Sequence, residues 1–269
     1  MKINIKLWPG ILIMVLVFFV AGCNQNTAEQ KGVFEPKTTV PQPVWNVGSD
    51  ISYPPFEFVE NDQYVGFDID LIKAIAAVEG CDIKINKLNS DALIPSVTNG
   101  TVDCIISSIT IKEEQAKQID FSKSYFKAGL IIAVDQKNED IKSLDDLKGK
   151  KLAAEVQTTG LEACNAVKAK DPKTTVKEFK TVLEAFSELE KGGVDAVIND
   201  MPVTNYYINS KGKDKVKMVG GILPDNNYYG IGVKKGNVDL LIKINSGFDK
   251  LKANGEYNQI YKKWFGDIK

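Results

Sequence analysis

Apolar and polar positions in the first half of the folded region follow strand and helix periods in turn. Residues 45–48 and 81–87 have strand patterns, and residues 102–110 form a third strand candidate with an apolar centre. Apolar residues recur at helical spacing from Ile69 to Val78, after Asp68, which can cap a helix. Residues 91–100 predict a short helix that ends at Asn99-Gly100. The predicted order is therefore β-α-β-α-β.

A long strand-like run at residues 121–134 is followed by a second set of alternating elements. Its strand patterns and helix patterns are as follows: strands at 150–156, 174–180 and 194–200, and helices at 158–170, 181–192 and 201–210. Another long strand pattern covers residues 226–235. The chain then closes with helical patterns at 237–252 and 256–265.

Two successive α/β units predict two parallel-rich sheets, each covered by helices. The last two helices have no strands of their own, so they must pack on an earlier lobe. We therefore expect an α/β fold of two lobes, with residues 45–126 plus 230–269 in a discontinuous lobe 1 and residues 127–229 in lobe 2. The chain then crosses between lobes at FKAG and at NYYG, which predicts two hinge strands. The cleft between hinged lobes is the expected ligand site.

The N-terminus has the pattern of a secretory signal. Lys2 and Lys6 precede an apolar run at 11–20, which is short for a membrane span, and Val20-Ala21-Gly22-Cys23 resembles a bacterial lipobox. This pattern predicts a signal peptide at residues 1–22 and lipidation of Cys23, with a short membrane anchor as the alternative. Residues 23–44 are rich in Asn, Gln, Thr, Lys and Pro, which favours a flexible tether.

Composition excludes several classes of function. All 34 basic residues are lysine, histidine is absent and the formal net charge is −1, so a nucleic-acid-binding face is not expected. Without histidine, the commonest metal ligand and the usual base of hydrolytic triads are missing. The four cysteines at 23, 81, 104 and 164 lack the short spacings of zinc or redox sites. We expect no metal site, no cofactor and no disulfide, with Cys104 and Cys164 as buried thiols.

Small hydroxyl residues, glycine and acids follow the predicted strands, where ligands gather in open α/β lobes. The four stretches are SDISY, SSIT, EVQTTG and IND. QTTG is either an ordinary helix cap or a helix start that binds a carboxylate through backbone N–H groups. Asp200 is either a cap or the partner of an ammonium group, and Tyr53 is either a packing residue or an aromatic wall. The glycines of YGIGVKKG lie within a strand pattern, so a dinucleotide site is rejected.

Five segments in order resemble the polar amino-acid family of extracellular solute-binding proteins of ABC importers. They are SDISYPPFEF, YVGFDIDLIKAIA, SSITIKEEQAKQIDFS, GVDAVINDMPV and NGEYNQIYKKWFG, and the resemblance covers residues 45–269. It implies the periplasmic-binding-protein-like fold, in which two lobes close over one solute. The glutamine-binding and the lysine/arginine/ornithine-binding proteins are similar members of that family.

The resemblance also implies the residues of the ligand site. Asp50 and Tyr53 match the side-chain contact and the aromatic wall, and Ser108 and Thr110 match residues that bind the α-ammonium and α-carboxylate groups. In lobe 2, Thr159 and Gly160, with Thr158 beside them, match the helix start that binds the carboxylate. Asp200 matches the acid that pairs with the α-ammonium group.

Two positions depart from the family pattern. The arginine that grips the α-carboxylate falls on Gln115, and a second stacking aromatic falls on Ser90. Replacing the charged, forked guanidinium group of arginine with the neutral amide of Gln115 is expected to lower the affinity for a neutral amino acid roughly 10- to 100-fold. Asp50 and Asp200, joined by Glu155, leave an excess of negative charge that favours a cationic ligand.

The sequence therefore predicts a receptor, and not an enzyme, that delivers a polar, cationic amino acid or related amine to an ABC permease. We expect a monomer outside the cytoplasm, anchored by lipid to the bacterial cell membrane. One alternative is an enzyme, because a cyclohexadienyl dehydratase shares the fold, with Glu155 as its proton donor. The other is a sensory or ligand-scavenging module.

Overall fold

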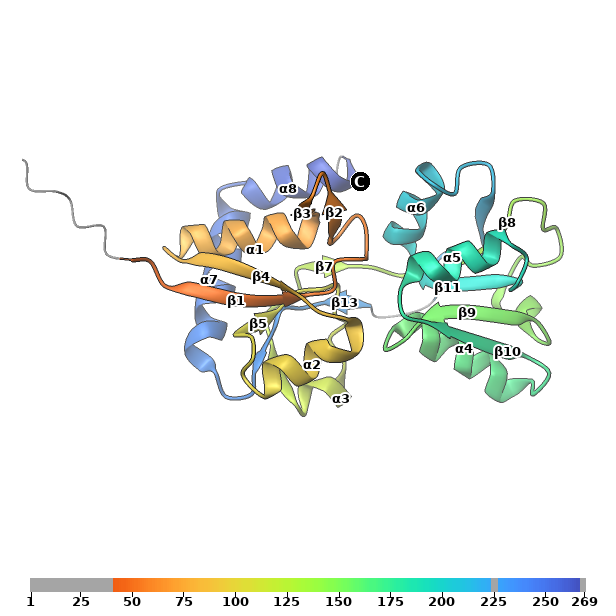
Figure 1. Ribbon diagram of the computed structural model, residues 1–269, viewed down its shortest axis with the longest axis horizontal. Coiled ribbons are helices and arrows are strands. Elements are labelled where there is room, and N and C mark those ends of the chain that lie inside the picture. The colour runs from red at the N-terminus through yellow and green to blue at the C-terminus, as the bar shows by residue number, and fades with distance from the viewer. Residues whose placement is uncertain (1–40, 224–226, 267–269) are drawn as a thin grey trace, which may run out of the picture. The chain divides into compact units, whose positions relative to one another are not determined.

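The first sheet holds five strands from both ends of the folded chain. In the computed structural model, which describes residues 41–223 and 227–266, the strand order is β4-β1-β5-β14-β6 (Figure 1). The strands are β1 (Val44–Ser49), β4 (Asp82–Lys87), β5 (Cys104–Ile105), β6 (Ile119–Phe121) and β14 (Gly232–Lys234). β1 runs parallel to β4 and β5, whereas β14 runs antiparallel to β5 and β6. The predicted signal peptide and lipidated Cys23, and most of the predicted tether, lie outside the described residues.

Helices cover both faces of the first sheet. They are α1 (Phe67–Val78), α2 (Ser90–Thr98), α3 (Glu113–Ala116), α7 (Val238–Ala253) and α8 (Glu256–Phe265). α1 packs on one face with α7 and α8 against Trp45 and Val47, while α2 places Leu93 and Val97 on the other face beside Ile105. A hairpin of β2 (Phe58–Glu60) and β3 (Gln63–Val65) precedes α1. We call this sheet and its helices the first lobe.

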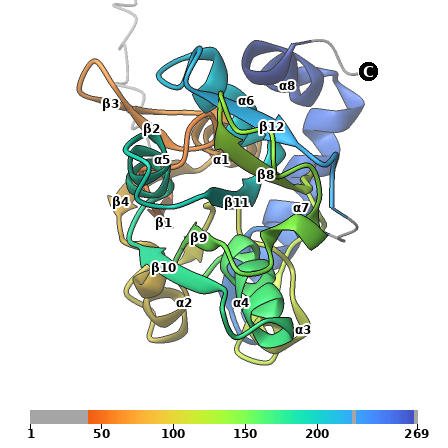
Figure 2. The same ribbon diagram turned by 90° about the vertical axis from the view of Figure 1, so that its right-hand side faces the viewer.

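The second sheet has the order β10-β9-β11-β8-β12. Its strands are β8 (Leu130–Asp135), β9 (Lys151–Glu155), β10 (Thr175–Phe179), β11 (Ala196–Asp200) and β12 (Val216–Val219). Figure 2 shows α4 (Thr159–Lys170) on one face and α5 (Val182–Glu190) and α6 (Met201–Asn209) on the other. Along β8, Leu130, Ile132 and Val134 pack on the α4 side, and Ala133 packs on the α5 side. We call this sheet and its helices, with the 3-10 helix η1 (Leu144–Leu147), the second lobe.

Both sheets are mixed, so the expectation of parallel-rich sheets is only half right. In the second sheet, β9 runs parallel to β10 and β11, but β8 runs antiparallel to β11 and β12. The antiparallel half consists of strands next to the crossovers between lobes, where the chain enters and leaves without a helical connection.

The long strand predicted at residues 121–134 is in fact three strands. β6 ends at Phe121 in the first sheet, β7 (Phe126–Lys127) pairs with β13 (Tyr228–Tyr229) between the sheets, and β8 starts at Leu130 in the second sheet. The predicted strand at 226–235 divides in the same way into β13 and β14. A chain that changes sheets must break its ladder, which an apolar pattern does not reveal.

The predicted strand at residues 102–110 is also too long, because only Cys104 and Ile105 join the sheet as β5. Beyond Ile105 the backbone leaves the ladder and forms the SSIT loop of the site described below. The strand prediction failed there because the loop, like the strand, keeps apolar side chains inside: Ile106 is fully buried and Ile109 is 8% exposed.

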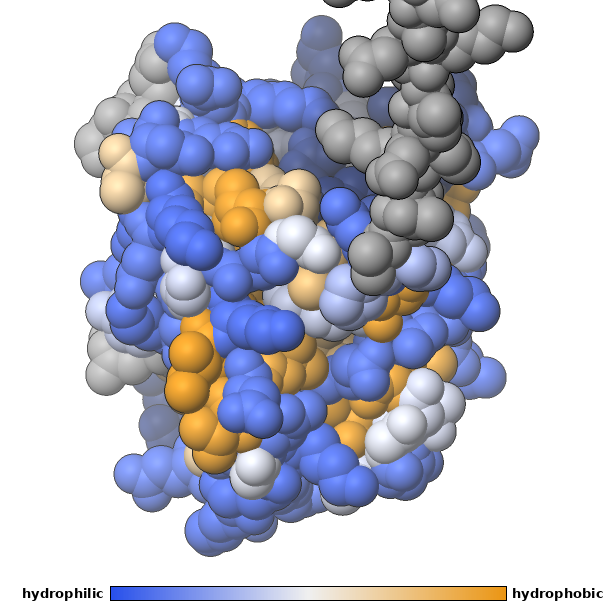
Figure 3. All heavy atoms as spheres, turned by 90° about the vertical axis from the view of Figure 1, so that its left-hand side faces the viewer, coloured by the Kyte–Doolittle hydropathy of each residue, from blue (hydrophilic) through white to orange (hydrophobic). Residues whose placement is uncertain are grey.

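The cysteines among the described residues lie in the core, and one face of the first lobe is mostly hydrophilic. Cys81, Cys104 and Cys164 are free and buried, which confirms the prediction of buried thiols for Cys104 and Cys164. Figure 3 shows a face of the first lobe that is mostly hydrophilic, with several groups of hydrophobic residues between the hydrophilic ones. Among the described residues, no helix has the length and apolar character needed to cross a membrane.

Candidate ligand-binding site

A cavity of about 540 Å³ lies between residues of the first and second lobes. Eight of the nine predicted ligand-binding residues line it: Asp50, Tyr53, Ser108, Thr110, Gln115, Thr158, Thr159 and Asp200. They follow the carboxyl ends of β1, β5, β9 and β11, as the topological argument predicts. Gly160 does not line the cavity.

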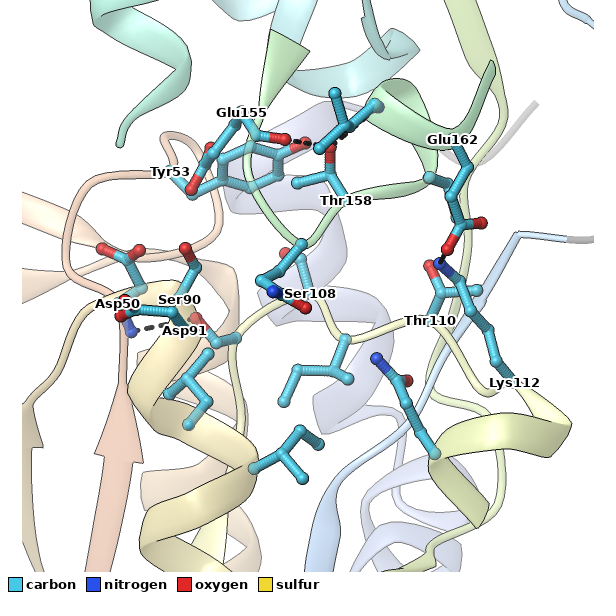
Figure 4. A pocket seen from close by; sticks show the side chains of 18 of the residues that line it. Asp50, Tyr53, Ser90, Asp91, Ser108, Thr110, Lys112, Glu155, Thr158 and Glu162 are labelled. Carbon is cyan, nitrogen blue, oxygen red and sulfur yellow. Dashed lines mark hydrogen bonds and ion pairs between the residues drawn. The ribbon is translucent and has the colours of Figure 1, made fainter. Parts of the chain in front are cut away.

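Asp50 lies at one end of the cavity with Ser90 and Asp91 (Figure 4). Its carboxylate accepts a hydrogen bond of 2.7 Å from Ser52 Oγ and another from the backbone of Ser90, the first residue of α2. Burial raises the pKa of Asp50, while these bonds and the charge of Lys87 oppose that rise. Because a helix N-terminus stabilises an anion, Asp50 supports α2 as well as facing the cavity.

Tyr53 and Asp200 join the two lobes. The Tyr53 hydroxyl oxygen lies 2.6 Å from Asp200 Oδ2 and 2.8 Å from Asn199 Oδ1, and both side chains at positions 53 and 200 are nearly inaccessible to solvent. Asp200 stands at the N-cap position of α6, yet its side chain makes no capping hydrogen bond. Its carboxylate is directed to other groups, so simple capping does not explain the acid.

Asn227, at the start of the second crossover, binds three of the predicted site residues. Its Nδ2 donates to Asp200 Oδ1 and to Thr159 Oγ1, and its Oδ1 accepts from Thr110 Oγ1. The side chain is completely buried. One carboxamide therefore connects a first-lobe residue with two second-lobe residues, next to the cavity.

Ser108 presents an unsatisfied hydroxyl group at the centre of the cavity wall (Figure 4). Its backbone has φ 50°, and its N–H donates a 2.8 Å hydrogen bond to Asp68 Oδ2. Within the part of the chain that the structure describes, its buried Oγ has no hydrogen-bond partner. A buried polar atom without a partner is costly, so a ligand that bonds it gains stability.

Two buried acids, Glu57 and Asp68, hold the loop that contains Ser108 through hydrogen bonds. Glu57 Oε1 accepts from Ser107 Oγ at 2.9 Å, and Asp68 Oδ2 accepts from Tyr125 OH at 2.8 Å. The two carboxyl groups also hydrogen-bond each other, which requires a proton on one of them. Burial, with the charge of Asp68 beside it, raises the pKa of Glu57 well above its usual range, and burial raises the pKa of Asp68 to about 6.

Asp68 thus has a different role from the one its position suggests. The residue can cap a helix, but α1 begins at Phe67, and no side chain caps its N-terminus. The Asp68 carboxylate instead holds Ser108 N and Tyr125 OH. Sequence alone does not separate a cap from a loop support, because both need an acid at the start of a helix.

Gln115 lies in α3 and lines the cavity where the resemblance places an arginine. Its buried Oε1 has no hydrogen-bond partner among residues 41–223 and 227–266. Nearby, Lys112 lies just before α3 and its Nζ lies 2.7 Å from Glu162 Oε1 in α4 (Figure 4). This ion pair connects the lobes at the end of the cavity opposite Asp50.

The second lobe contributes the start of α4. Thr158 caps this helix, because its Oγ1 accepts from Leu161 N at 3.2 Å, and the same hydroxyl donates to Glu155 O at 2.7 Å. Gly160 is explained by packing, since a Cβ there would lie 2.3 Å from Ile198 O in β11. The capping interpretation of this stretch is therefore correct for Thr158, and a role of Gly160 in ligand binding stays a prediction.

Glu155 lines the cavity but also has a structural partner. Its Oε2 accepts from Val182 N, the first residue of α5, at 3.1 Å. Burial and the nearby charges of Asp50 and Asp200 raise its pKa well above the usual range, while the bond from Val182 opposes that rise. Glu155 therefore adds hydrogen-bonding capacity more than charge.

Sequence reasoning missed Lys112 and Asn227. Lys112 had a usable signal: in the extended run ITIK, residues 110 and 112 point to the same side, so a cavity-facing Thr110 predicts a cavity-facing Lys112. Asn227 had none, because its role depends on a crossover that brings both lobes together.

Comparison with known proteins agrees with this geometry. Residues 45–267 match the family model of the bacterial extracellular solute-binding proteins, family 3. A probable histidine-binding protein of Neisseria gonorrhoeae is 31% identical over 97% of this chain and 96% of its own length. The ABC transporter glutamine-binding protein of Bacillus subtilis (strain 168) is 37% identical over 74% of this chain and 72% of its own length.

A solved structure of an ancestral arginine-binding protein bound to arginine is similar throughout the folded region. It is 43% identical, has a TM-score of 0.80, and matches 84% of this chain and 99% of its own. These relatives are binding proteins, which supports the prediction of a receptor over that of an enzyme. From the family match and the two-lobed α/β fold, we conclude that this chain belongs to the bacterial extracellular solute-binding proteins, family 3.

Proposed function

We propose that the protein is the lipid-anchored receptor of an ABC importer, and that it captures an α-amino acid with a cationic side chain in the cavity between its lobes. The observation that carries this proposal is the charge of the cavity wall. Seven acidic residues and one lysine line it within the described chain: Asp50, Glu57, Asp91, Glu114, Glu155, Glu162, Asp200 and Lys112.

The charge is concentrated where a ligand side chain would lie. Glu57 and Glu155 have raised pKa values because they are buried, so they contribute less charge near neutral pH. Asp50 and Asp91 lie at one end of the cavity, beside Ser90, where the family resemblance implies a stacking aromatic residue. A carboxylate in a partly buried wall binds an ammonium or guanidinium group more strongly than a neutral amide.

The other groups suit the α-amino acid moiety. In this proposal Asp200, which lines the cavity, accepts from the α-ammonium group, and Ser108 Oγ and the Gln115 amide offer unsatisfied hydrogen-bonding capacity. Thr110 and Thr159 place hydroxyl groups from both lobes on the same cavity. Relatives named for histidine, glutamine and arginine agree with an α-amino acid as the ligand.

Calorimetric titration tests the ligand class. Wild-type protein is titrated with arginine, lysine, histidine and glutamine, and we expect the cationic amino acids to bind more tightly than glutamine. Asp50→Asn should weaken arginine binding by roughly tenfold or more, because a charge-assisted bond becomes neutral, and should change glutamine binding little. Asp82→Asn, at an exposed acid in β4 outside the cavity, is the matched control. Equal loss for arginine and glutamine, or tighter binding of glutamine by the wild type, would contradict the cationic preference.

The membrane part of the proposal rests on Val20-Ala21-Gly22-Cys23. We propose cleavage before Cys23, lipidation of its thiol and delivery of the ligand to a membrane permease from outside the cytoplasm. Expression of the whole chain in a bacterium with a labelled fatty acid should give a labelled membrane-associated protein. Cys23→Ala should lose the label and leave the membrane fraction, and a label that persists in this variant would exclude the site.

A further inference from the structure

Lys112 is the single basic side chain that lines the cavity in the described part of the chain. Neutral Gln115 occupies the position where the family resemblance implies a carboxylate-binding arginine. A ligand carboxylate that enters this cavity would meet an excess of acids. A neutral amide does not offset that repulsion, so a cation on the cavity wall favours binding of a carboxylate here.

The position of Lys112 fits this role. It lies two residues after Thr110 in an extended segment, so the two side chains point to the same side. Figure 4 shows Thr110, Lys112 and Glu162 together at one end of the cavity and Asp50, Ser90 and Asp91 at the other. An extended amino acid placed between them would direct its cationic side chain to the acids and its carboxylate to Lys112.

The present partner of Lys112 is easy to replace. Its Nζ lies 2.7 Å from Glu162 Oε1, but the Glu162 side chain is 66% exposed, whereas that of Lys112 is 21% exposed. An ion pair with so exposed a carboxylate is screened by water and salt and contributes little. A ligand carboxylate held within the cavity is less hydrated and forms the stronger pair.

We propose that Lys112 is the carboxylate-binding cation of this receptor, and that its Nζ exchanges Glu162 for the α-carboxylate of the ligand when the ligand binds. This inference rests on the proposed function and adds the residue that distinguishes an amino acid from the corresponding amine. It also explains how the site can bind an α-amino acid with Gln115 at the arginine position.

The test compares ligands that differ only by the carboxylate. Wild type, Lys112→Met and Lys112→Arg are titrated with arginine and agmatine, and with lysine and cadaverine. Lys112→Met should weaken binding of both amino acids by roughly tenfold or more and change amine binding by less than about threefold. Lys112→Arg should keep amino-acid binding within about threefold. A thermal melt of each variant checks that it folds.

Two further variants separate exchange from a purely structural contact. Lys117→Met removes an exposed lysine of the same segment, paired with Glu114, that does not line the cavity, and it should change no affinity. Glu162→Gln frees Lys112 and should tighten amino-acid binding without tightening amine binding.

The outcomes are distinct. Equal weakening of amino acid and amine in Lys112→Met would show that Lys112 only holds the lobes together and would overturn the inference. Retained amino-acid affinity in Lys112→Met would overturn it as well. If the wild type binds none of the four ligands, the proposed function fails, and the inference fails with it.

Discussion

The side-chain amide of Asn227 donates a hydrogen bond to Oδ1 of Asp200, the acid expected to hold the ligand's α-ammonium group. The carbonyl oxygen of the same amide accepts from Thr110 in the other lobe. Asn227 thus makes two of the contacts expected of a bound amino acid, one to an acid and one to a hydroxyl group. Its hydrogen bonds connect the two lobes, so they contribute to the free energy of the site as well as to that of the fold.

Asn227→Ala should lower the free energy of unfolding by about 1–3 kcal/mol, because it removes buried hydrogen bonds that include one to a carboxylate. Asn227→Asp should cost more, since it places a second acid beside Asp200. Denaturant unfolding of the ligand-free protein measures both. Asn209→Ala, at an exposed position at the end of α6, serves as the control and should stay within about 0.5 kcal/mol of wild type. A wild-type stability for Asn227→Ala would show that these bonds contribute nothing net.

Gln115→Arg should raise the affinity for glutamine and other neutral α-amino acids by roughly tenfold or more. The guanidinium group supplies a charged, forked donor to the carboxylate, where the present amide supplies a neutral one. Calorimetric titration measures the change. Glu113→Arg adds a cation on the exposed side of the same short helix and should have a much smaller effect. Unchanged affinity in Gln115→Arg would place the carboxylate away from residue 115.

The buried acids Glu57 and Asp68 should make the protein less stable as the pH rises from about 5 to 8. Both groups have raised pKa values, and that of Asp68 lies at about 6 against 3.8 for the free side chain. The folded state therefore binds protons more firmly than the unfolded state. Their contribution is complete below the unfolded pKa and is lost as the pH rises through the folded pKa. Below about pH 4, exposed acids with lowered pKa values, such as Asp120 beside Lys235, act in the opposite direction.

Thermal melts at pH 5.5 and pH 8 measure this effect. Glu57→Gln replaces the shared proton with a permanent amide donor to Asp68, so the difference between the two melting temperatures should shrink in this variant. The groups that face the pair are Asp50, Ser107, Ser108 and Tyr125, and the variant leaves them in place. Asp62→Asn, at the exposed turn between β2 and β3, should keep the wild-type difference. An unaltered difference in Glu57→Gln would assign the pH dependence to other groups.

Gly160→Ala should destabilise the second lobe by about 1–3 kcal/mol. The new methyl group would meet the carbonyl oxygen of Ile198 at 2.3 Å, so α4 must move away from β11. Denaturant unfolding measures the loss, and Ala166→Gly, at an exposed position later in the same helix, provides a comparison that costs helix propensity only. Wild-type stability of Gly160→Ala would show that α4 can shift freely.

Much of this fold could be predicted from sequence periodicity. The helices α1, α4, α5, α7 and α8 lie within one or two residues of their predicted limits, because each has apolar residues at helical spacing that pack against the rest of its lobe. The crossovers could not be predicted in detail. The run from Phe121 to Val134 has a strand-like pattern along its length, and only the three-dimensional path shows that it serves two sheets in succession. The exact limits of the two lobes stay a prediction for the same reason.

Some residues of the site could likewise be predicted from the sequence, and others could not. Asp50, Ser108 and Thr110 follow strands and could be placed by topology together with family resemblance. Asn227 could not, because its partners lie 27 to 117 residues away in sequence and meet only when both lobes are assembled. Asp68 shows a further limit: its residue type was noticed, but its partner Ser108 belongs to a loop 40 residues later.

Aromatic side chains on the two crossovers between the lobes restrict where the lobes can rotate relative to each other. Phe126 of the first crossover stacks with Tyr229 of the second at 5.8 Å and with Tyr261 of α8 at 5.8 Å. Both crossovers are thus fixed to the last helix of the chain on their first-lobe side. Any rotation of the second lobe must then have its pivot beyond these rings, close to the cavity. Rotation of the lobes away from each other would then separate Lys112 from Glu162, because each belongs to a different lobe.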